Sequence, residues 1–291
     1  MSWLQCKLDT TRATVEALED AMLAAGAVSV TFQDLEDEPI LEPGVGETPL
    51  WNNIRLVGLF TADTDTTLAT VQATAHYGDL PPHRWEILED KDWEREWMAN
   101  YHPIQCGERL WVCPSWTEPP QANAVNLMLD PGLAFGTGTH PTTFLCLKWL
   151  DSLDLTGKTV VDYGCGSGIL GIAALLLGAE KVVAIDNDPQ ALIATVENGK
   201  RNNIDPKRLS TYLPDEAPAL QADITAANIL AAPLIELAET LSTLTRSGGQ
   251  LCMAGLIAPQ TGSVKAAYEN QFDFGPEQSQ DEWVRLSATK R

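Results

Sequence analysis

Apolar and polar residues along the first 90 positions form short blocks that predict strands and helices in turn. Residues 28–32 alternate apolar and polar side chains, as a strand with one buried face does. Residues 11–25 repeat apolar side chains at helical spacing, and Gly26 follows as a C-terminal stop. The predicted strands are 2–9, 28–32, 54–61 and 84–88, and the predicted helices are 11–25 and 66–76. This βαββαβ order predicts a small ferredoxin-like α+β domain over residues 1–90.

From residue 139 onward, the blocks become longer helices and nearly continuous apolar strands. The predicted helices are 141–153, 169–177, 189–202 and 232–244, and the predicted strands are 159–162, 182–186, 209–213, 222–227, 250–255 and 283–289. Such strands alternating with helices are typical of a mainly parallel sheet covered on both faces. We therefore expect a doubly wound α/β domain over residues 107–291, beginning with two strands at 110–114 and 124–129.

The segment between these domains, residues 91–106, is predicted to be a linker containing a short helix at 92–101. Five of the nine tryptophans lie between residues 85 and 116. Large amphipathic rings near a domain joint indicate either an interdomain contact or a substrate surface. Ordinary core packing explains each ring equally well.

The charge balance restricts the class of partner. The chain has 291 residues, with 19 Lys and Arg against 40 Asp and Glu, a formal net charge of −21. A nucleic-acid-binding protein normally carries a basic stripe, and none is evident, so no direct nucleic-acid contact is expected. A strongly acidic surface favours a basic partner, although acidity also serves solubility.

The cysteines and the apolar runs indicate the cellular compartment of the protein. Six cysteines are scattered without a C-x-x-C pair or zinc-ligand spacing, so no metal site is predicted, and a reducing compartment fits. The N-terminus lacks an apolar signal core, and no apolar run approaches the roughly 18 residues that span a membrane. We expect a soluble, cytoplasmic monomer.

The strongest chemical motif is VVDYGCGSGIL at residues 160–170, where a strand gives way to a helix. Glycines there permit a tight turn and close approach of a ligand to the backbone. The dinucleotide fingerprint requires Gly or Ala at position 169, but Ile169 is present. The G-x-G-x-G spacing from Gly164, with Asp162 just before it, resembles motif I of class I methyltransferases.

An acidic side chain ends the next predicted strand. Asp186 lies 22 residues after Gly164, where a carboxylate can accept hydrogen bonds from both hydroxyls of a ribose. Asp188 precedes Pro189, and this pair is typical of a helix N-cap followed by proline at the first helical position. We therefore assign Asp186 to a nucleoside cofactor and Asp188 to helix initiation.

Asn228 ends the fourth strand of the predicted sheet. An asparagine after an apolar strand is by itself a common turn former. At this place, Asn228 resembles the N-P-P-Y position of amino-group methyltransferases, where the asparagine carbonyl accepts a hydrogen bond from the substrate nitrogen. Ile229 and Leu230 follow instead of prolines and an aromatic ring, which favours an aliphatic amine over a flat base.

A glycine-rich loop at residues 129–143 runs into a predicted helix and is placed to fold over a bound cofactor. His140 in this loop is a candidate general base. Because it stands before Pro141, we interpret it mainly as a helix-entry residue.

With these motifs, the chain resembles the ribosomal protein L11 methyltransferase (PrmA) family over its whole length. The resemblance rests on KDWEREW at 91–97, FGTGTHPTT at 135–143 and NIL at 228–230. It implies a Rossmann-like class I methyltransferase domain using S-adenosylmethionine, with Thr143, Gly164, Asp186 and Asn228 as cofactor contacts and Asn228 also catalytic. It implies that residues 1–90 recognise the basic ribosomal protein, and that the products are methylated lysines and a methylated N-terminal α-amine.

Other functions remain open from the residues alone. A methyltransferase of the same fold could act on RNA or a small metabolite, but the net charge and the extra N-terminal domain disfavour RNA. A nicotinamide oxidoreductase is disfavoured by Ile169. A binding module without catalysis is disfavoured by the joint presence of Gly164, Asp186 and Asn228.

Overall fold

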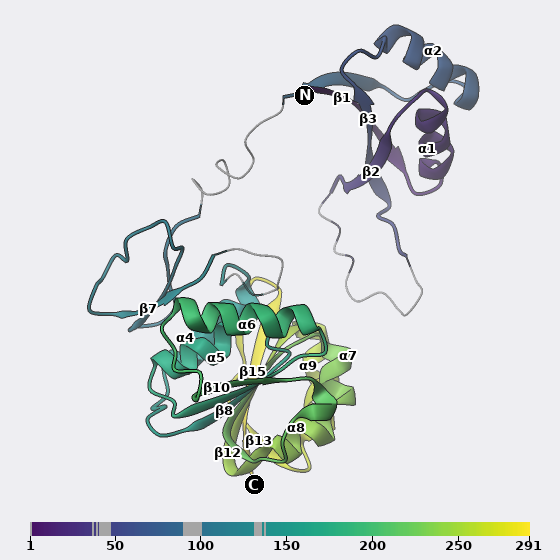
Figure 1. Cartoon of the computed structure of the whole chain (residues 1–291). Helices are drawn as coiled ribbons and strands as arrows, with labels where there is room; N and C mark the ends of the chain where they lie inside the picture. The colour runs from purple at the N-terminus through teal and green to yellow at the C-terminus, as the bar shows by residue number, and fades with distance from the viewer. Residues whose placement is uncertain are drawn as a thin grey trace. The chain divides into compact units, whose positions relative to one another are not determined.

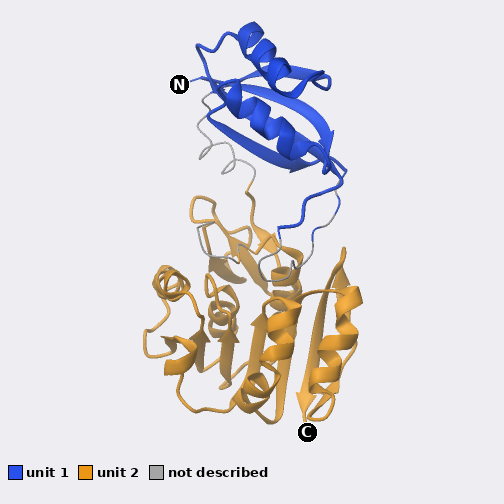
Figure 2. Ribbon diagram, turned by 90° about the vertical axis from the view of Figure 1, so that its right-hand side faces the viewer, with its two compact units in different colours: residues 1–98 blue, residues 99–291 orange. Residues whose placement is uncertain are grey.

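The computed structural model describes residues 2–36, 38, 40, 48–89, 101–130, 136 and 138–291. The chain forms two compact units, residues 1–98 (the N-terminal unit) and residues 99–291 (the C-terminal unit), coloured separately in Figure 2. The helix predicted at 92–101 lies outside the described residues, apart from Tyr101. No helix of the described ranges has the length and apolar character needed to cross a membrane.

The N-terminal unit has the predicted βαββαβ order (Figure 1). Its elements are β1 (Trp3–Thr11), α1 (Val15–Ala24), β2 (Ser29–Asp34), β3 (Asn53–Thr61), α2 (Thr66–Tyr77) and β4 (His83–Leu88). The sheet order is β2-β3-β1-β4, and every neighbouring pair is antiparallel. Alternate strand residues such as Leu8 and Leu56 pack with Leu18 of α1 and Ala69 of α2, so both helices cover one face. The predicted ferredoxin-like arrangement is confirmed.

The C-terminal unit contains a large sheet, its covering helices and a small three-stranded sheet. The small sheet is β5 (Ile104–Gln105), β6 (Leu110–Cys113) and β7 (Val125–Met128). The strands of the large sheet are β8 (Thr159–Tyr163), β9 (Lys181–Ile185), β10 (Leu209–Tyr212), β11 (Ala222–Asn228), β12 (Thr245–Ile257), β13 (Phe272–Phe274), β14 (Gln278–Gln280) and β15 (Trp283–Lys290). The helices are α4 (Pro141–Asp151), α5 (Ile169–Leu176), α6 (Pro189–Arg201), α7 (Ala231–Glu236), α8 (Ala238–Leu244) and α9 (Thr261–Tyr268), with short 3-10 turns at Pro214–Glu216 and Ala258–Gln260.

The strand order of the large sheet is β10-β9-β8-β11-β12-β15-β13, with β14 also paired to β15. The strands from β10 to β12 are parallel, and β15 runs antiparallel to its neighbours. The chain moves outward from β8 through β9 to β10 and then returns to β11 on the other side of β8. In such sheets, ligands bind outside the carboxyl ends of the strands at this reversal point.

Two layers of helices cover the large sheet, as predicted. Val160 of β8 packs with Leu147 of α4 and Ile172 of α5, whereas Val161 faces the other layer. That second layer contains Leu234 of α7, Leu241 of α8 and Val264 of α9. Because successive strand residues point to opposite faces, strands apolar at every position are buried on both sides.

The structure differs from the prediction at the C-terminal end of the chain. The helix predicted at 232–244 is two helices that meet at Leu237. Leu234 and Leu241 both face the sheet across the break, so the apolar spacing did not reveal it. The strand predicted at 250–255 is longer, since β12 begins at Thr245 and includes an irregular stretch beside β11. The segments α9, β13 and β14 were not predicted.

Candidate functional site

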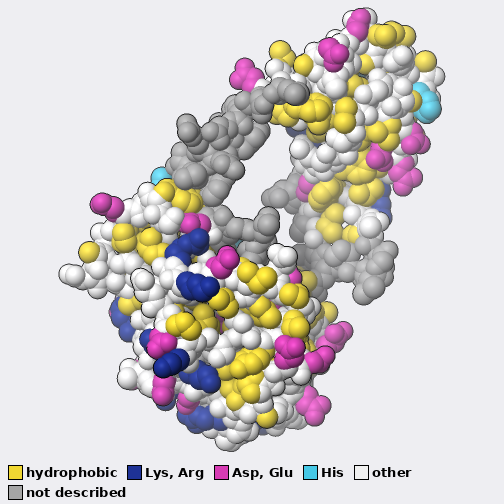
Figure 3. Space-filling model, in the orientation of Figure 1, with side chains coloured by type: hydrophobic (Ala, Val, Ile, Leu, Met, Phe, Trp, Pro, Cys, Tyr) yellow, Lys and Arg dark blue, Asp and Glu magenta, His cyan; other side chains and the backbone are white. Residues whose placement is uncertain are grey.

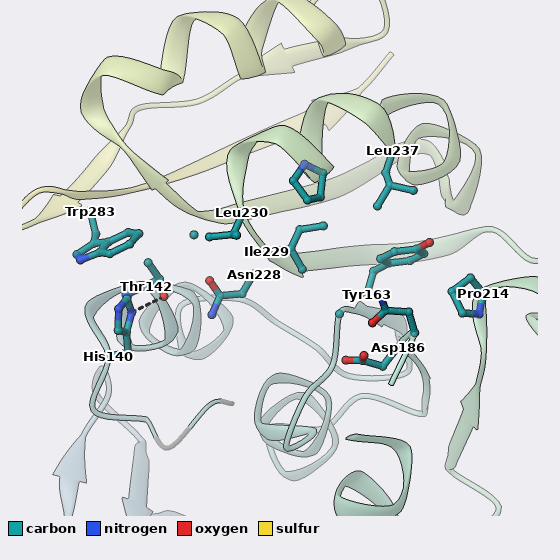
Figure 4. Close-up of a pocket in the computed structure, with 14 residues that line it drawn as sticks. His140, Thr142, Tyr163, Asp186, Pro214, Asn228, Ile229, Leu230, Leu237 and Trp283 are labelled. Atoms are coloured by element: carbon teal, nitrogen blue, oxygen red, sulfur yellow. Dashed lines mark hydrogen bonds between the residues drawn. The ribbon is translucent and has the colours of Figure 1, made fainter. Parts of the chain in front are cut away.

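A cavity of about 700 Å³ opens at the carboxyl ends of the central strands (Figure 4). This volume lies within the range of small-molecule sites. Its lining residues come from the strand ends, the loops after them, α7 with its C-cap and the start of α4: His140, Thr142, Tyr163, Gly164, Asp186, Asn187, Pro214, Asn228, Ile229, Leu230, Pro233, Leu237, Gly255 and Trp283. Three of the four predicted site residues, Gly164, Asp186 and Asn228, are therefore brought together in the lining of one cavity. Thr143 is not part of this lining.

The glycine-rich turn after β8 is held against the end of β9. Gly164 has φ +72° and donates its N–H to the Ile185 carbonyl at 2.7 Å. A Cβ at this position would overlap the Ile229 side chain. Glycine is thus required at position 164 both for its backbone conformation and for the close approach of the loop after β11.

Asp186 connects this turn to the start of α6. Its Oδ2 accepts from the Gly166 N–H at 2.9 Å, and its Oδ1 accepts from the Asp188 N–H at 3.0 Å. Asp188 then accepts from the Gln190 N–H as the N-cap of α6, with proline following, as predicted. The Asp186 carboxylate lines the cavity, and each oxygen retains lone-pair capacity for a ligand hydroxyl.

Asn228 places a buried side-chain oxygen at the site. Its Nδ2 donates to the Thr143 hydroxyl at 3.2 Å. Its Oδ1 is buried and has no hydrogen-bond partner among the described residues. Buried acceptors without a partner are uncommon in folded proteins, so an orphaned one in a cavity wall indicates a place for a ligand donor. Thr143 is fully buried on α4, and its contact with Asn228 orients the amide.

His140 closes one end of the cavity, beside Trp283 (Figure 4). The two rings contact edge to face, with centroids 4.8 Å apart. His140 Nδ1 lies 2.7 Å from the Thr142 hydroxyl and also accepts from the Thr142 N–H, so His140 caps α4 as expected of a helix-entry residue. Burial lowers the pKa of His140, against an opposing effect of Glu282, and so favours the neutral ring.

Asp162 lies beneath the glycine-rich turn and outside the cavity lining. Its buried carboxylate accepts from the Gly171 N–H of α5 at 2.8 Å. Burial raises the pKa of Asp162 to about 7, with a smaller contribution from the nearby charge of Asp186. Through its hydrogen bond to Gly171, the Asp162 side chain connects the end of β8 to α5, the helix that follows the turn.

Several lining residues carry no signal in the local sequence. Gly255 reaches the site because β12 pairs with β11, and Trp283 reaches it because the antiparallel β15 begins beside the end of β12; no local pattern shows these pairings. Pro214 lines the cavity after β10, whereas the adjacent acidic residues Asp215 and Glu216 do not. In the loop predicted to fold over a cofactor, residues 131–135 and 137 lie outside the described residues.

The cavity is polar at isolated points and apolar between them. In Figure 4, Asp186 and Pro214 lie at one end, His140 and Trp283 at the other, and Asn228 between them. A nucleoside fits the first end, because Asp186 can accept from ribose hydroxyls and the prolyl ring offers an apolar contact for a base. Nowhere in the described part of the chain do His, Cys, Asp and Glu cluster to hold a metal ion.

Comparison with known proteins is consistent with this geometry. The family model for ribosomal protein L11 methyltransferase (PrmA) matches residues 2–291. Proteins named ribosomal protein L11 methyltransferase from Cellvibrio japonicus and Escherichia coli are 61% and 56% identical, each covering 100% of this chain, with 99% and 100% of the relative covered. A crystal structure of the ribosomal protein L11 methylase from Lactobacillus delbrueckii subsp. bulgaricus is 31% identical with a TM-score of 0.59, over 66% of this chain and 100% of that one. The chain therefore belongs to the ribosomal protein L11 methyltransferase family.

Proposed function

We propose that the cavity binds S-adenosylmethionine and that the enzyme methylates amines of ribosomal protein L11, on lysine side chains and at the N-terminal α-amine. The observation that carries this proposal is the buried Oδ1 of Asn228, which has no hydrogen-bond partner among the described residues and lies in a largely apolar wall. The names of the relatives support the choice of substrate protein.

The proposed cofactor residues have different roles in binding S-adenosylmethionine. Gly164 lets the cofactor approach the backbone after β8, and Asp186 accepts from the ribose hydroxyls. The family resemblance also predicts Thr143 and Asn228 as cofactor contacts. Since Thr143 stands behind Asn228, we propose that it acts mainly by orienting the Asn228 amide.

The amine must lose its proton before it can react. A free lysine has a pKa of about 10.4, so near pH 7.4 its neutral form costs about 4 kcal/mol. The apolar wall formed by Leu230 and Trp283 disfavours the ammonium form and lowers that cost. A neutral His140 adds no positive charge beside the arriving amine.

Asn228 then orients the nucleophile. Its Oδ1 accepts a hydrogen bond from an amine N–H, which directs the nitrogen lone pair toward the methyl donor. S-adenosylmethionine supplies a methyl group on a sulfonium, and as the N–C bond forms the C–S bond breaks to leave a neutral thioether. The leaving group needs no acid, and the excess proton on nitrogen passes to water. Orientation of this kind supplies several kcal/mol of rate enhancement.

We further propose that residues 1–90 recognise the ribosomal protein. A fragment of residues 99–291 retains β5 and the buried Cys106, together with every proposed cofactor residue. This fragment should bind S-adenosylmethionine and methylate intact L11 poorly. Calorimetry and an initial-rate assay test both points, and full activity of a well-folded fragment would contradict the recognition role.

Incubation with methyl-labelled S-adenosylmethionine and a bacterial extract tests the substrate class. Label should accumulate in one small basic protein on a denaturing gel. Label in the RNA or small-molecule fraction instead would contradict the proposal.

A further inference from the structure

Helix α2 of the N-terminal unit has its larger apolar side chains on the outside. The residues that it buries against the sheet are Ala69 and Ala73, whereas Leu68 and Val71 are 55% and 59% exposed. Leu68 and Val71 are three positions apart and so lie side by side on the helix surface. The fold of the unit alone does not use these two side chains.

The surface around Leu68 and Val71 carries negative charge. Helix α2 has no Asp, Glu, Lys or Arg over its whole length, Thr66–Tyr77. Its neighbour α1 presents Glu16, Glu19 and Asp20, and Asp63 and Asp65 precede α2. Figure 3 shows hydrophobic and acidic side chains on the surface of this unit. The outer helical face thus combines an apolar centre with acidic surroundings.

The opposite face of the same unit has a different character. Among the described residues, the strands carry Lys7, Arg55 and Arg84 on this face with two facing carboxylates, Asp9 and Glu86. Arg55 makes two hydrogen bonds to Asp9, while Lys7 and Arg84 share Glu86. A basic partner would meet an excess of positive charge on this face.

We propose that the outer helical face, Leu68 and Val71 of α2 with Glu16, Glu19 and Asp20 of α1, is the docking surface for the basic ribosomal protein. The inference rests on the proposed function and specifies which face of the N-terminal unit does the recognising. Protein interfaces typically pair an apolar centre with a polar rim, and opposite charges accelerate association. A second copy of this chain is a poorer occupant, because its own acidic rim would oppose like charge.

The test is a Leu68→Gln/Val71→Gln double variant, matched by Val28→Gln. Val28 is 58% exposed and belongs to neither α1 nor α2, because it lies in the connection between α1 and β2. We expect the double variant to raise KM for intact L11 roughly tenfold or more, the scale for losing a pair of interface anchors. Its kcat, its affinity for S-adenosylmethionine and its rate on a short lysine peptide should equal those of the wild type. The control variant should leave all four quantities unchanged.

A variant that removes the acidic side chains of α1 tests the proposal independently. Glu16→Gln/Glu19→Gln/Asp20→Asn should lower kcat/KM for L11 at low salt, and this difference should shrink as salt is added. If neither set of changes alters KM for L11, the docking surface is wrong. The same conclusion follows if the double variant only abolishes a dimer seen by sedimentation. If the wild type does not methylate L11 at all, the proposed function fails instead.

Discussion

Gly255 should be a position where one methyl group disables the site. It lies on β12 with φ +88°, and a Cβ there would lie 2.7 Å from the Ile229 carbonyl carbon and closer still to its oxygen. Gly248, on the same strand, has φ +70°, but the nearest atom to its Cβ would be Arg246 Nη1 at 3.6 Å. Both glycines adopt a positive φ, but a Cβ would overlap backbone atoms only at Gly255.

The expected magnitudes follow from that difference. The left-handed conformation costs a residue with a Cβ about 1–2 kcal/mol, which applies to Gly248→Ala and Gly255→Ala alike. Overpacking against backbone adds about 1–3 kcal/mol at position 255 alone. Because Ile229 follows Asn228, relief of the overlap must also move the Asn228 amide. A displacement of about 1 Å at a reacting geometry costs on the order of 100-fold in rate.

Urea unfolding and single-turnover methylation measure the two effects. Gly255→Ala should lose about 1–3 kcal/mol more stability than Gly248→Ala and should transfer methyl groups far more slowly at saturating S-adenosylmethionine. Gly248→Ala should retain the wild-type single-turnover rate. Equal rates for the two variants would refute the argument that the Ile229 backbone positions Asn228.

Three further changes test the remaining parts of the site. Asp186→Ala should weaken S-adenosylmethionine binding by about 1.5–3 kcal/mol in calorimetry, because charged hydrogen bonds are lost; unchanged affinity in a folded variant would rule out the ribose role. Asn228→Ala should strongly reduce the single-turnover rate while changing the melting temperature little, and cofactor affinity should be measured in parallel. If the variant instead melts earlier and keeps the wild-type rate, Asn228 is only a turn residue. The folded-state pKa of Asp162, about 7, lies above its ordinary 3.8, so the folded protein holds a proton that the unfolded chain releases. The stability of the wild type relative to Asp162→Asn should therefore fall as pH rises from about 4 to 7 and then level off; a difference independent of pH would contradict the raised pKa.

The predictable parts of this protein were those encoded by local pattern. Gly164 and Asp186 directly follow strands and Asn228 ends one, the apolar run of each strand is visible in the sequence, and parallel strands bring such ends to one edge. The unpredicted parts depend on which strands are neighbours. Trp283 joins the site because β15 inserts antiparallel beside β12, and Thr143 meets Asn228 because α4 packs under β11.

The apolar periodicity also did not reveal where the backbone of an element breaks or begins. The break at Leu237 leaves Leu234 and Leu241 on the same buried face, so the apolar spacing is that of one helix. The N-terminal residues of β12 are polar or glycine, so the pattern placed the start of that strand too late. Burial of a carboxylate such as Asp162 requires the three-dimensional packing around it and leaves no signature in spacing.

The most direct test of the account is the mass of purified ribosomal protein L11 after incubation with this enzyme and S-adenosylmethionine. We predict that the intact mass increases in steps of one methyl group, and that peptide mapping places the groups on lysine side chains and the N-terminal amine. The Asn228→Ala variant should leave L11 unmodified over the same period. An unchanged mass with the wild-type enzyme, or methyl groups found on residues other than amines, would contradict the account.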